Sequence, residues 1–273
     1  MNLTFFTTLP AIARVSCFFL AWVLCWLPIA LPLGIWLQWR PGQPVSSQQK
    51  IPLLLSLYLL APGLLWGSAR LTGLPLSTYG LTWTGQSLVL GAIGWGLGCL
   101  GIGILVGLQL RFGWLIWQAQ PGRQVLPTLV AIAGLGGFVA LIEEWVFRGF
   151  LLTQLQQDYS WLGAAIGSSL IFALLHLVWD GLKIRLQLPG LWLMGMVLVL
   201  ARWAMDGNLG LAWGLHAGWI GVLATLDSTG LIKPADGAPA WMTGIDGQPL
   251  AGAMSLLLLL GTATLIWGYR ALG

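Results

Sequence analysis

Five of the ionisable side chains inside apolar stretches of this 273-residue chain could do chemistry there. They are two adjacent carboxylates, a guanidinium and two imidazoles: Glu143, Glu144, Arg148, His176 and His216. The chain contains no other glutamate and no other histidine. Because an apolar environment solvates charge poorly, such groups predict a functional site, with a structural ion pair as the alternative. The chemistry that carboxylates and imidazoles support is proton transfer or metal binding.

The two carboxylates are predicted to have different tasks. Residues four apart share one face of a helix, so Glu144 lies beside Arg148, and the acid precedes the base as favourable pairing requires. Glu143 points about 100° away around the helix. We expect Glu144 and Arg148 to neutralise each other, which leaves Glu143 free to act on a water or substrate as a general base or acid. The alternative is that all three residues form one structural charge cluster.

The two histidines are predicted to lie at the depth of Glu143. Phe172 and His176 share a helix face, and the polar break at 156–160 makes the flanking segments an antiparallel hairpin. At the helical rise, Glu143 and His176 lie about 20 and 24 Å from that turn. His216 follows the break at 206–208 and lies roughly 12 Å above the same side, close enough to join them if the helices tilt or the chain dips. The spacing therefore predicts that three helices bring these groups together.

Two kinds of hydrolytic chemistry fit this set. Glu143, His176 and His216 could together bind Zn²⁺, although the compact HExxH helix is missing. Alternatively, Glu143 and His176 polarise a water while His216 steadies the oxyanion formed at an attacked carbonyl, with no metal or other cofactor. A serine nucleophile is disfavoured, because Ser168 and Ser169 lie in a small-residue packing stretch and no GxSxG turn occurs.

The composition indicates the setting of these residues. Hydrophobic residues make up 58% of the chain and charged residues 7%, which is too few to cover a water-soluble surface. The net charge of +4 comes from scattered cations that suit lipid headgroups, and no basic face for nucleic acid is present. We expect an integral, multi-pass membrane protein whose surroundings are the lipid bilayer of the plasma (cytoplasmic) membrane or another internal membrane.

Eight apolar segments approach or exceed the length of about 20 residues that a helix needs to cross the hydrocarbon core. They span residues 15–37, 51–68, 87–110, 127–155, 161–178, 188–203, 209–226 and 250–268. They lack the alternation of barrel strands, so helices remain as the structure that satisfies the backbone in lipid. The prediction is all-α: a polytopic transmembrane bundle of about eight membrane helices, forming one integral membrane domain over residues 1–273.

Small residues four apart predict close helix contacts within this bundle, because they let two backbones approach. Three such pairs occur in the third and fourth segments: Gly94 and Gly98, Gly103 and Gly107, and Ala133 and Gly137.

The order of the polar motifs resembles the CPBP family of intramembrane proteases, which includes CAAX-type prenyl-protein endopeptidases and bacterial Abi or bacteriocin-processing relatives. Three motifs on consecutive helices carry the resemblance: Glu143-Glu144-x-x-x-Arg148, Phe172-x-x-x-His176, and His216. The likeness spans roughly residues 127–226, a CAAX-protease-like catalytic core within the membrane domain. The other predicted helices carry no recognisable signature.

The resemblance implies an endopeptidase that cleaves a membrane-associated protein or peptide. It assigns water activation to Glu143, assistance to His176 and an oxyanion contact to His216, with Glu144, Arg148 and Phe172 in support. The family has been described both as metal-dependent and as glutamate-dependent, and we favour glutamate chemistry without a metal.

One departure from the family pattern concerns the oxyanion contact. Four residues after its last histidine the family usually places asparagine or another polar residue, and here that position is Ile220. Asn208 is a candidate replacement on a similar helix face. A catalytically inactive family member that binds a membrane partner or confers immunity is therefore an alternative function. A proton-coupled transporter using Glu143 and the histidines is a further alternative, although no repeat symmetry supports it.

Overall fold

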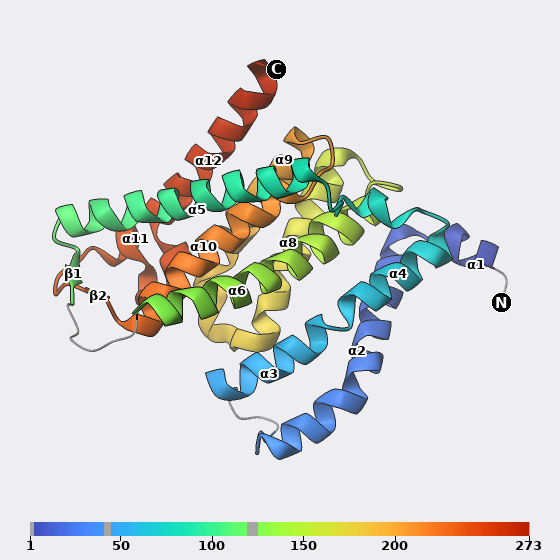
Figure 1. Ribbon diagram of the computed structural model, residues 1–273, viewed down its shortest axis with the longest axis horizontal. Helices are drawn as coiled ribbons and strands as arrows, with labels where there is room; N and C mark the ends of the chain where they lie inside the picture. Colours follow the sequence, from blue (N-terminus) through green and yellow to red (C-terminus); the bar gives the residue numbers. More distant parts are fainter. Residues whose placement is uncertain (1–2, 41–44, 119–124, 273) are drawn as a thin grey trace.

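The computed structural model describes residues 3–40, 45–118 and 125–272, which form a bundle of helices with one small strand pair (Figure 1). The long helices are α2 (Ala11–Trp36), α5 (Gly85–Arg111), α6 (Val125–Glu143), α8 (Trp161–Asp180), α9 (Leu188–Ala204), α10 (Gly210–Thr229) and α12 (Ala253–Leu272). Between α2 and α5, α3 (Ser47–Tyr58) and α4 (Ala61–Thr72) follow one another closely. A π-helix, η2 (Glu144–Leu151), continues α6 into α7 (Leu152–Leu155).

Shorter elements connect these helices. The helical ones are α1 (Leu3–Thr8), η1 (Leu76–Tyr79), η3 (Gly181–Gln187), α11 (Ala240–Thr243), η4 (Ile245–Gly247) and η5 (Pro249–Ala251). The strands β1 (Leu115–Trp117) and β2 (Ile232–Pro234) pair antiparallel and join the loop after α5 to the loop after α10.

The predicted helical membrane bundle is confirmed, and the chain is an integral multi-pass membrane protein. Each predicted apolar segment is helical, although the segment at 51–68 is broken into α3 and α4. Within the described residues, six helical segments are both long and apolar enough to cross a bilayer. One of them, Trp161–Ala204, unites two predicted spans, and α10 is not among the six. The predicted number of eight membrane helices is therefore not established.

Helix α10 occupies the interior of the bundle. It packs against α5, α6 and α9, while α8 and α12 both pack against α9 (Figure 1). On another side, α2 packs against α3 and α4. This arrangement surrounds α10 with helices distant in the sequence, so a polar residue on α10 can meet side chains from several of them.

Glycines explain how closely α5 and α10 approach. A Cβ atom added to Gly94 would lie 2.5 Å from the carbonyl oxygen of Leu211, and one added to Gly98 would lie 2.7 Å from that of Leu215. Such distances exclude any side chain. The prediction of close packing is thus confirmed for this pair. It is wrong for the second pair in α5, because the space beside Gly103 and Gly107 is open in the described part of the chain.

The third predicted pair, Ala133 and Gly137, does not bring another helix close to its glycine. Gly137 of α6 has no atom of a neighbouring element within 4 Å of an added Cβ among the described residues. The partners of the α5 glycines are instead three glycines of α10, spaced four apart, which the sequence reasoning overlooked: Gly210, Gly214 and Gly218.

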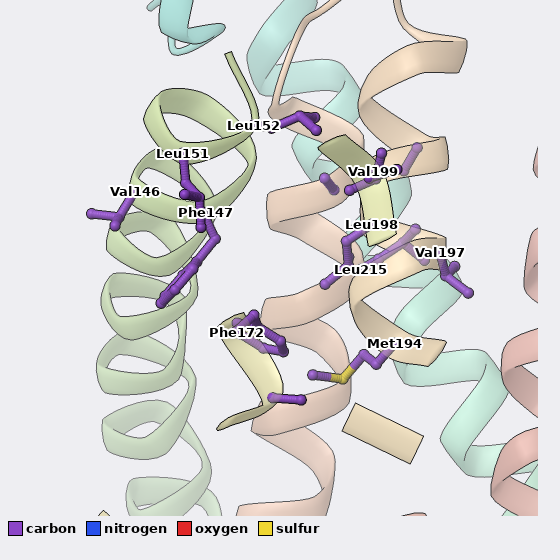
Figure 2. Packing of buried hydrophobic residues seen from close by; sticks show 14 of the residues in the cluster. Val146, Phe147, Leu151, Leu152, Phe172, Met194, Val197, Leu198, Val199 and Leu215 are labelled. Atoms are coloured by element: carbon purple, nitrogen blue, oxygen red, sulfur yellow. The ribbon is translucent and has the colours of Figure 1, made fainter. Parts of the chain in front are cut away.

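A hydrophobic core joins η2 to α8, α9 and α10, and part of it is shown in Figure 2. Its buried members include Phe147 from η2, Phe172 from α8, Leu198 from α9 and Leu215 from α10. Since each of these side chains is less than a tenth exposed, the four elements are held in a defined relation. The polar residues of the same elements are positioned by this packing.

Candidate functional site

The two adjacent glutamates lie at the junction between α6 and the π-helix η2. Glu143 is the last residue of α6 and Glu144 the first of η2. Both are buried, Glu143 at 8% and Glu144 at 0% exposure, and Glu143 lines two cavities whose walls do not include Glu144. The difference agrees with the predicted separation of their environments.

Glu144 binds two cationic or potentially cationic groups through one oxygen. Arg148 donates from Nη1 to Glu144 Oε1 over 2.9 Å, which confirms the predicted pairing. His216 Nδ1 lies 2.8 Å from the same oxygen. Because a carboxylate accepts this hydrogen bond, Nδ1 carries the proton and Nε2 is left for another partner. The Glu144–His216 contact was not predicted from the sequence.

Glu143 also has a partner that the sequence analysis missed. The hydroxyl of Tyr58, at the end of α3, donates to Glu143 Oε1 over 2.5 Å. The expectation that Glu143 is free of partners is therefore wrong. Its other oxygen, Oε2, lies 3.6 Å from Nε2 of His216. Thus the carboxylate is held on one side and faces an imidazole on the other.

His176 of α8 is oriented by its own helix. Its Nδ1 lies 2.9 Å from the carbonyl oxygen of Phe172, which can only accept a hydrogen bond. The proton is therefore on Nδ1, and Nε2 of the neutral ring can accept. The ring is half-buried and lines the same cavities as Glu143, without a direct hydrogen bond to that carboxylate among the described residues.

Phe172 connects the charged pair to both histidines. The guanidinium carbon of Arg148 lies 4.1 Å from the centre of the Phe172 ring, a cation–π contact. The ring centres of His176 and His216 lie 4.7 and 6.0 Å from that of Phe172, both edge-to-face. One aromatic ring thus contacts the guanidinium and both imidazoles.

Two cavities meet at the glutamate. The first has a volume of about 290 Å³ and the second about 560 Å³. Four residues line both of them: Tyr58, Glu143, His176 and Trp179. Since the carboxylate lies in both walls, groups in either cavity can approach it.

The two cavities differ in chemistry. His216 lines the first cavity, as do Lys50 and Asp180, whose Nζ and Oδ1 atoms form an ion pair of 2.7 Å. The second cavity is lined mostly by apolar and aromatic side chains, among them Trp22 and Phe147. Both cavities therefore have largely apolar walls, and the first differs from the second by containing His216 and, farther from Glu143, this ion pair.

Ile220 lies in the wall of this site, whereas Asn208 does not. Ile220 lines the first cavity one helical turn after His216 and presents only hydrocarbon. Asn208 donates to Ser87 Oγ over 2.8 Å and accepts from the backbone of Gly210 over 2.7 Å. Because both ends of the Asn208 amide are used between α5 and α10, this side chain does not replace the missing donor.

The alternative prediction of a zinc site formed by Glu143, His176 and His216 can be compared with the geometry that zinc requires. A structural or catalytic zinc needs at least three nitrogen, sulfur or oxygen ligands converging at about 2 Å from the ion. In the described part of the chain, no group of three His, Cys, Asp or Glu side chains has the spacing to hold a metal ion.

Arg202 of α9 supports the π-helix and was also missed. It donates to the backbone carbonyls of Arg148 and Gly149, and over 3.1 Å to Thr153 Oγ1. It also donates to the carbonyl of Thr78 over 3.0 Å. A π-helix interrupts the regular α-helical pattern, and this guanidinium satisfies carbonyls at its end. The signal in the sequence was a single arginine ending an apolar segment.

Comparison with known proteins finds a similarity in the central part of the chain. Residues 124–222 match the family model described as type II CAAX prenyl endopeptidase, Rce1-like. The matched range contains all the motif residues of α6, η2, α8 and α10, while Tyr58 lies outside it. No curated protein and no solved structure matches the chain significantly.

Proposed function

We propose that this membrane protein is an intramembrane endopeptidase, because residues 124–222 match the family model of Rce1-like type II CAAX prenyl endopeptidases. Its substrate is a membrane-associated protein or peptide, and a glutamate-activated water cleaves the peptide bond. The observation that supports this most strongly is the geometry of Glu143. Its carboxylate is buried in a cavity wall, with Oε2 only 3.6 Å from the His216 imidazole.

Water activation is assigned to Glu143. Its Oε2 takes a proton from a water in the first cavity while the water oxygen attacks the carbonyl carbon of the substrate. The same carboxyl group then returns the proton to the departing amine as the carbon–nitrogen bond breaks. His176 assists by accepting a hydrogen bond at Nε2, because its Nδ1 already donates to the carbonyl of Phe172.

His216 is assigned to the oxyanion. When both ring nitrogens carry protons, Nε2–H can donate to the negative oxygen that forms during attack. The Glu144 carboxylate at Nδ1 holds the ring in place and stabilises the imidazolium charge. Arg148 and Phe172 in turn hold Glu144 and both rings, which is the supporting role we assign to them.

The second cavity is assigned to an apolar part of the substrate. Its volume of about 560 Å³ lies within the range of pockets that bind small molecules. Aromatic walls formed by α2, α3 and α8 suit an apolar side chain or lipid group arriving from the bilayer. With such a group in the second cavity, the adjoining peptide bond would reach Glu143 from that side.

The test uses the full chain reconstituted in liposomes with a panel of membrane-anchored peptides, lipidated and unlipidated. The wild type should cleave a subset of the panel, and Glu143→Gln should lower kcat by about 10² to 10⁴, the usual contribution of general acid–base catalysis. The matched control is Asp236→Asn, which removes an exposed carboxylate and should leave cleavage unchanged. Cleavage by Glu143→Gln at the wild-type rate would overturn the assignment.

The same preparation separates the alternative functions. Tight binding of a peptide without any cleavage would favour an inactive, partner-binding protein, and proton-coupled flux into the liposomes would favour a transporter. Chelator treatment followed by metal analysis addresses zinc. We expect metal-depleted protein to retain its activity, and activity that is lost and then restored by Zn²⁺ would favour the metal-dependent mechanism.

A further inference from the structure

Tyr58 is the residue outside the matched region that touches the proposed water-activating group. It ends α3, is 7% exposed and donates its hydroxyl hydrogen to Glu143 Oε1 over 2.5 Å. Its ring centre lies 6.1 Å from that of Trp22, so α2 helps to hold it. The residue lines both cavities. Its hydroxyl therefore lies next to the position that a substrate carbonyl beside Glu143 would occupy.

Besides the His216 imidazole, the oxyanion calls for a second hydrogen-bond donor, and two nearby residues of the first cavity do not provide it. Ile220, one turn beyond His216 in the first cavity, has only hydrocarbon to offer. The ammonium group of Lys50 is paired with Asp180, and Lys50 lies eight residues before Tyr58, about 12 Å along α3. In contrast, the Tyr58 hydroxyl is a neutral donor already at the carboxylate.

We propose that Tyr58 is a catalytic hydrogen-bond donor that serves Glu143 before the attack and the oxyanion after it. This inference depends on the proposed endopeptidase function. Before the attack, the hydroxyl fixes the ionised carboxylate so that Oε2 points toward the water. A hydrogen bond to a charged acceptor is stronger than one to a neutral acceptor, so the hydroxyl remains with Glu143 while Glu143 is ionised.

The transfer of a proton from water to Glu143 then changes the acceptor of the Tyr58 hydroxyl. Glu143 becomes a neutral acid when it takes the proton of the attacking water, and the negative charge moves to the substrate oxygen. The Tyr58 O–H rotates toward that oxyanion, which is now the charged acceptor. When the carbon–nitrogen bond breaks and the amine takes the proton from Glu143, the carboxylate is restored and the hydroxyl returns to it. Tyr58 keeps its own proton throughout.

The experiment compares Tyr58→Phe with Tyr79→Phe in the liposome assay. Tyr79 is also a fully buried tyrosine, and its hydroxyl accepts from Gln154 Nε2 over 3.5 Å, away from both cavities. Loss of one oxyanion donor costs about 10² to 10³ in kcat, so Tyr58→Phe should show this decrease with little change in KM. Tyr79→Phe should keep the wild-type kcat.

A second pair of variants distinguishes a catalytic donor from a merely structural hydroxyl. Ile220→Asn places an amide in the first cavity and should raise kcat more in the Tyr58→Phe background than in the wild type. If Tyr58→Phe does not fold, 3-fluorotyrosine at position 58 retains the hydroxyl and should keep kcat within about tenfold of the wild type.

The outcomes separate this inference from the proposed function. Two results would overturn the role of Tyr58 alone while the wild type cleaves. In the first, Tyr58→Phe is as fast as the wild type. In the second, Tyr58→Phe and Tyr79→Phe are impaired to the same degree. The same conclusion follows if 3-fluorotyrosine abolishes cleavage in folded protein. If the wild type cleaves nothing in the panel and so behaves like Glu143→Gln, the result overturns both the endopeptidase function and the role of Tyr58.

Discussion

Glu144 Oε1 lies 2.8 Å from His216 Nδ1, so a carboxylate at the start of η2 holds an imidazole in the middle of α10. The same oxygen accepts from Arg148 over 2.9 Å. All three residues are at most 1% exposed. Glu144 is therefore the link between the π-helix and the central helix of the bundle, in addition to being the counter-ion of Arg148.

We expect Glu144→Gln to destabilise the protein by about 3 to 5 kcal/mol, because it leaves the buried Arg148 guanidinium without its negative partner. The measurement is the free energy of unfolding by SDS titration in mixed micelles. The double variant Glu144→Gln/Arg148→Met removes both charges and should recover part of the loss. A change below about 1 kcal/mol for Glu144→Gln alone would contradict the pairing seen in the structure.

The contacts of Arg202 lead to a second prediction. Arg202→Met removes the donors for at least two buried carbonyls at the end of η2, and each unsatisfied group costs about 1 to 3 kcal/mol. A total loss of about 2 to 4 kcal/mol is expected in the same unfolding titration. Arg270→Met is the matched control, since Arg270 pairs with Asp206 at an exposed site, and this substitution should cost at most about 1 kcal/mol. Equal losses in the two variants would show that Arg202 does not support the π-helix.

The contact between α5 and α10 can be tested with two glycines two residues apart. Gly94→Ala places a methyl group 2.5 Å from the Leu211 carbonyl oxygen and should cost about 1 to 3 kcal/mol through overpacking. Gly96→Ala puts the same methyl group into open space on the same helix. Its stability should be unchanged or higher by up to about 1 kcal/mol, since alanine favours helix. Thermal unfolding of the two purified variants, followed by circular dichroism, would rank them.

Local spacing was enough to predict several features of this protein. The apolar runs located the helices, because a helix in lipid must satisfy its own backbone. The four-residue spacing placed Arg148 beside Glu144, and the hairpin between α6 and α8 brought His176 to the level of Glu143. These features depend on one helix or on two neighbouring helices, so the helical rise and repeat determine them.

Contacts between distant helices could not be predicted in this way. Tyr58 is 85 residues from Glu143, and its position depends on how α3 packs against α6. The contact of Glu144 with His216 depends on the rotation of α10, which the glycines facing α5 help to determine. The π-helix was also not predicted, because no proline or glycine pattern marks its start. The residue that satisfies its carbonyls, Arg202, comes from α9, which is distant in the sequence.

The two cavities that share Glu143 have a consequence for inhibition. A compound that fills only the apolar cavity beside Trp22 would occupy the space proposed for an apolar part of the substrate and leave the carboxylate accessible from the other side. A compound confined to the smaller cavity beside His216 would exclude water and leave the apolar site open. Molecules of these two kinds could bind at the same time, and a linker passing Tyr58 and Glu143 would join them into a single bivalent ligand.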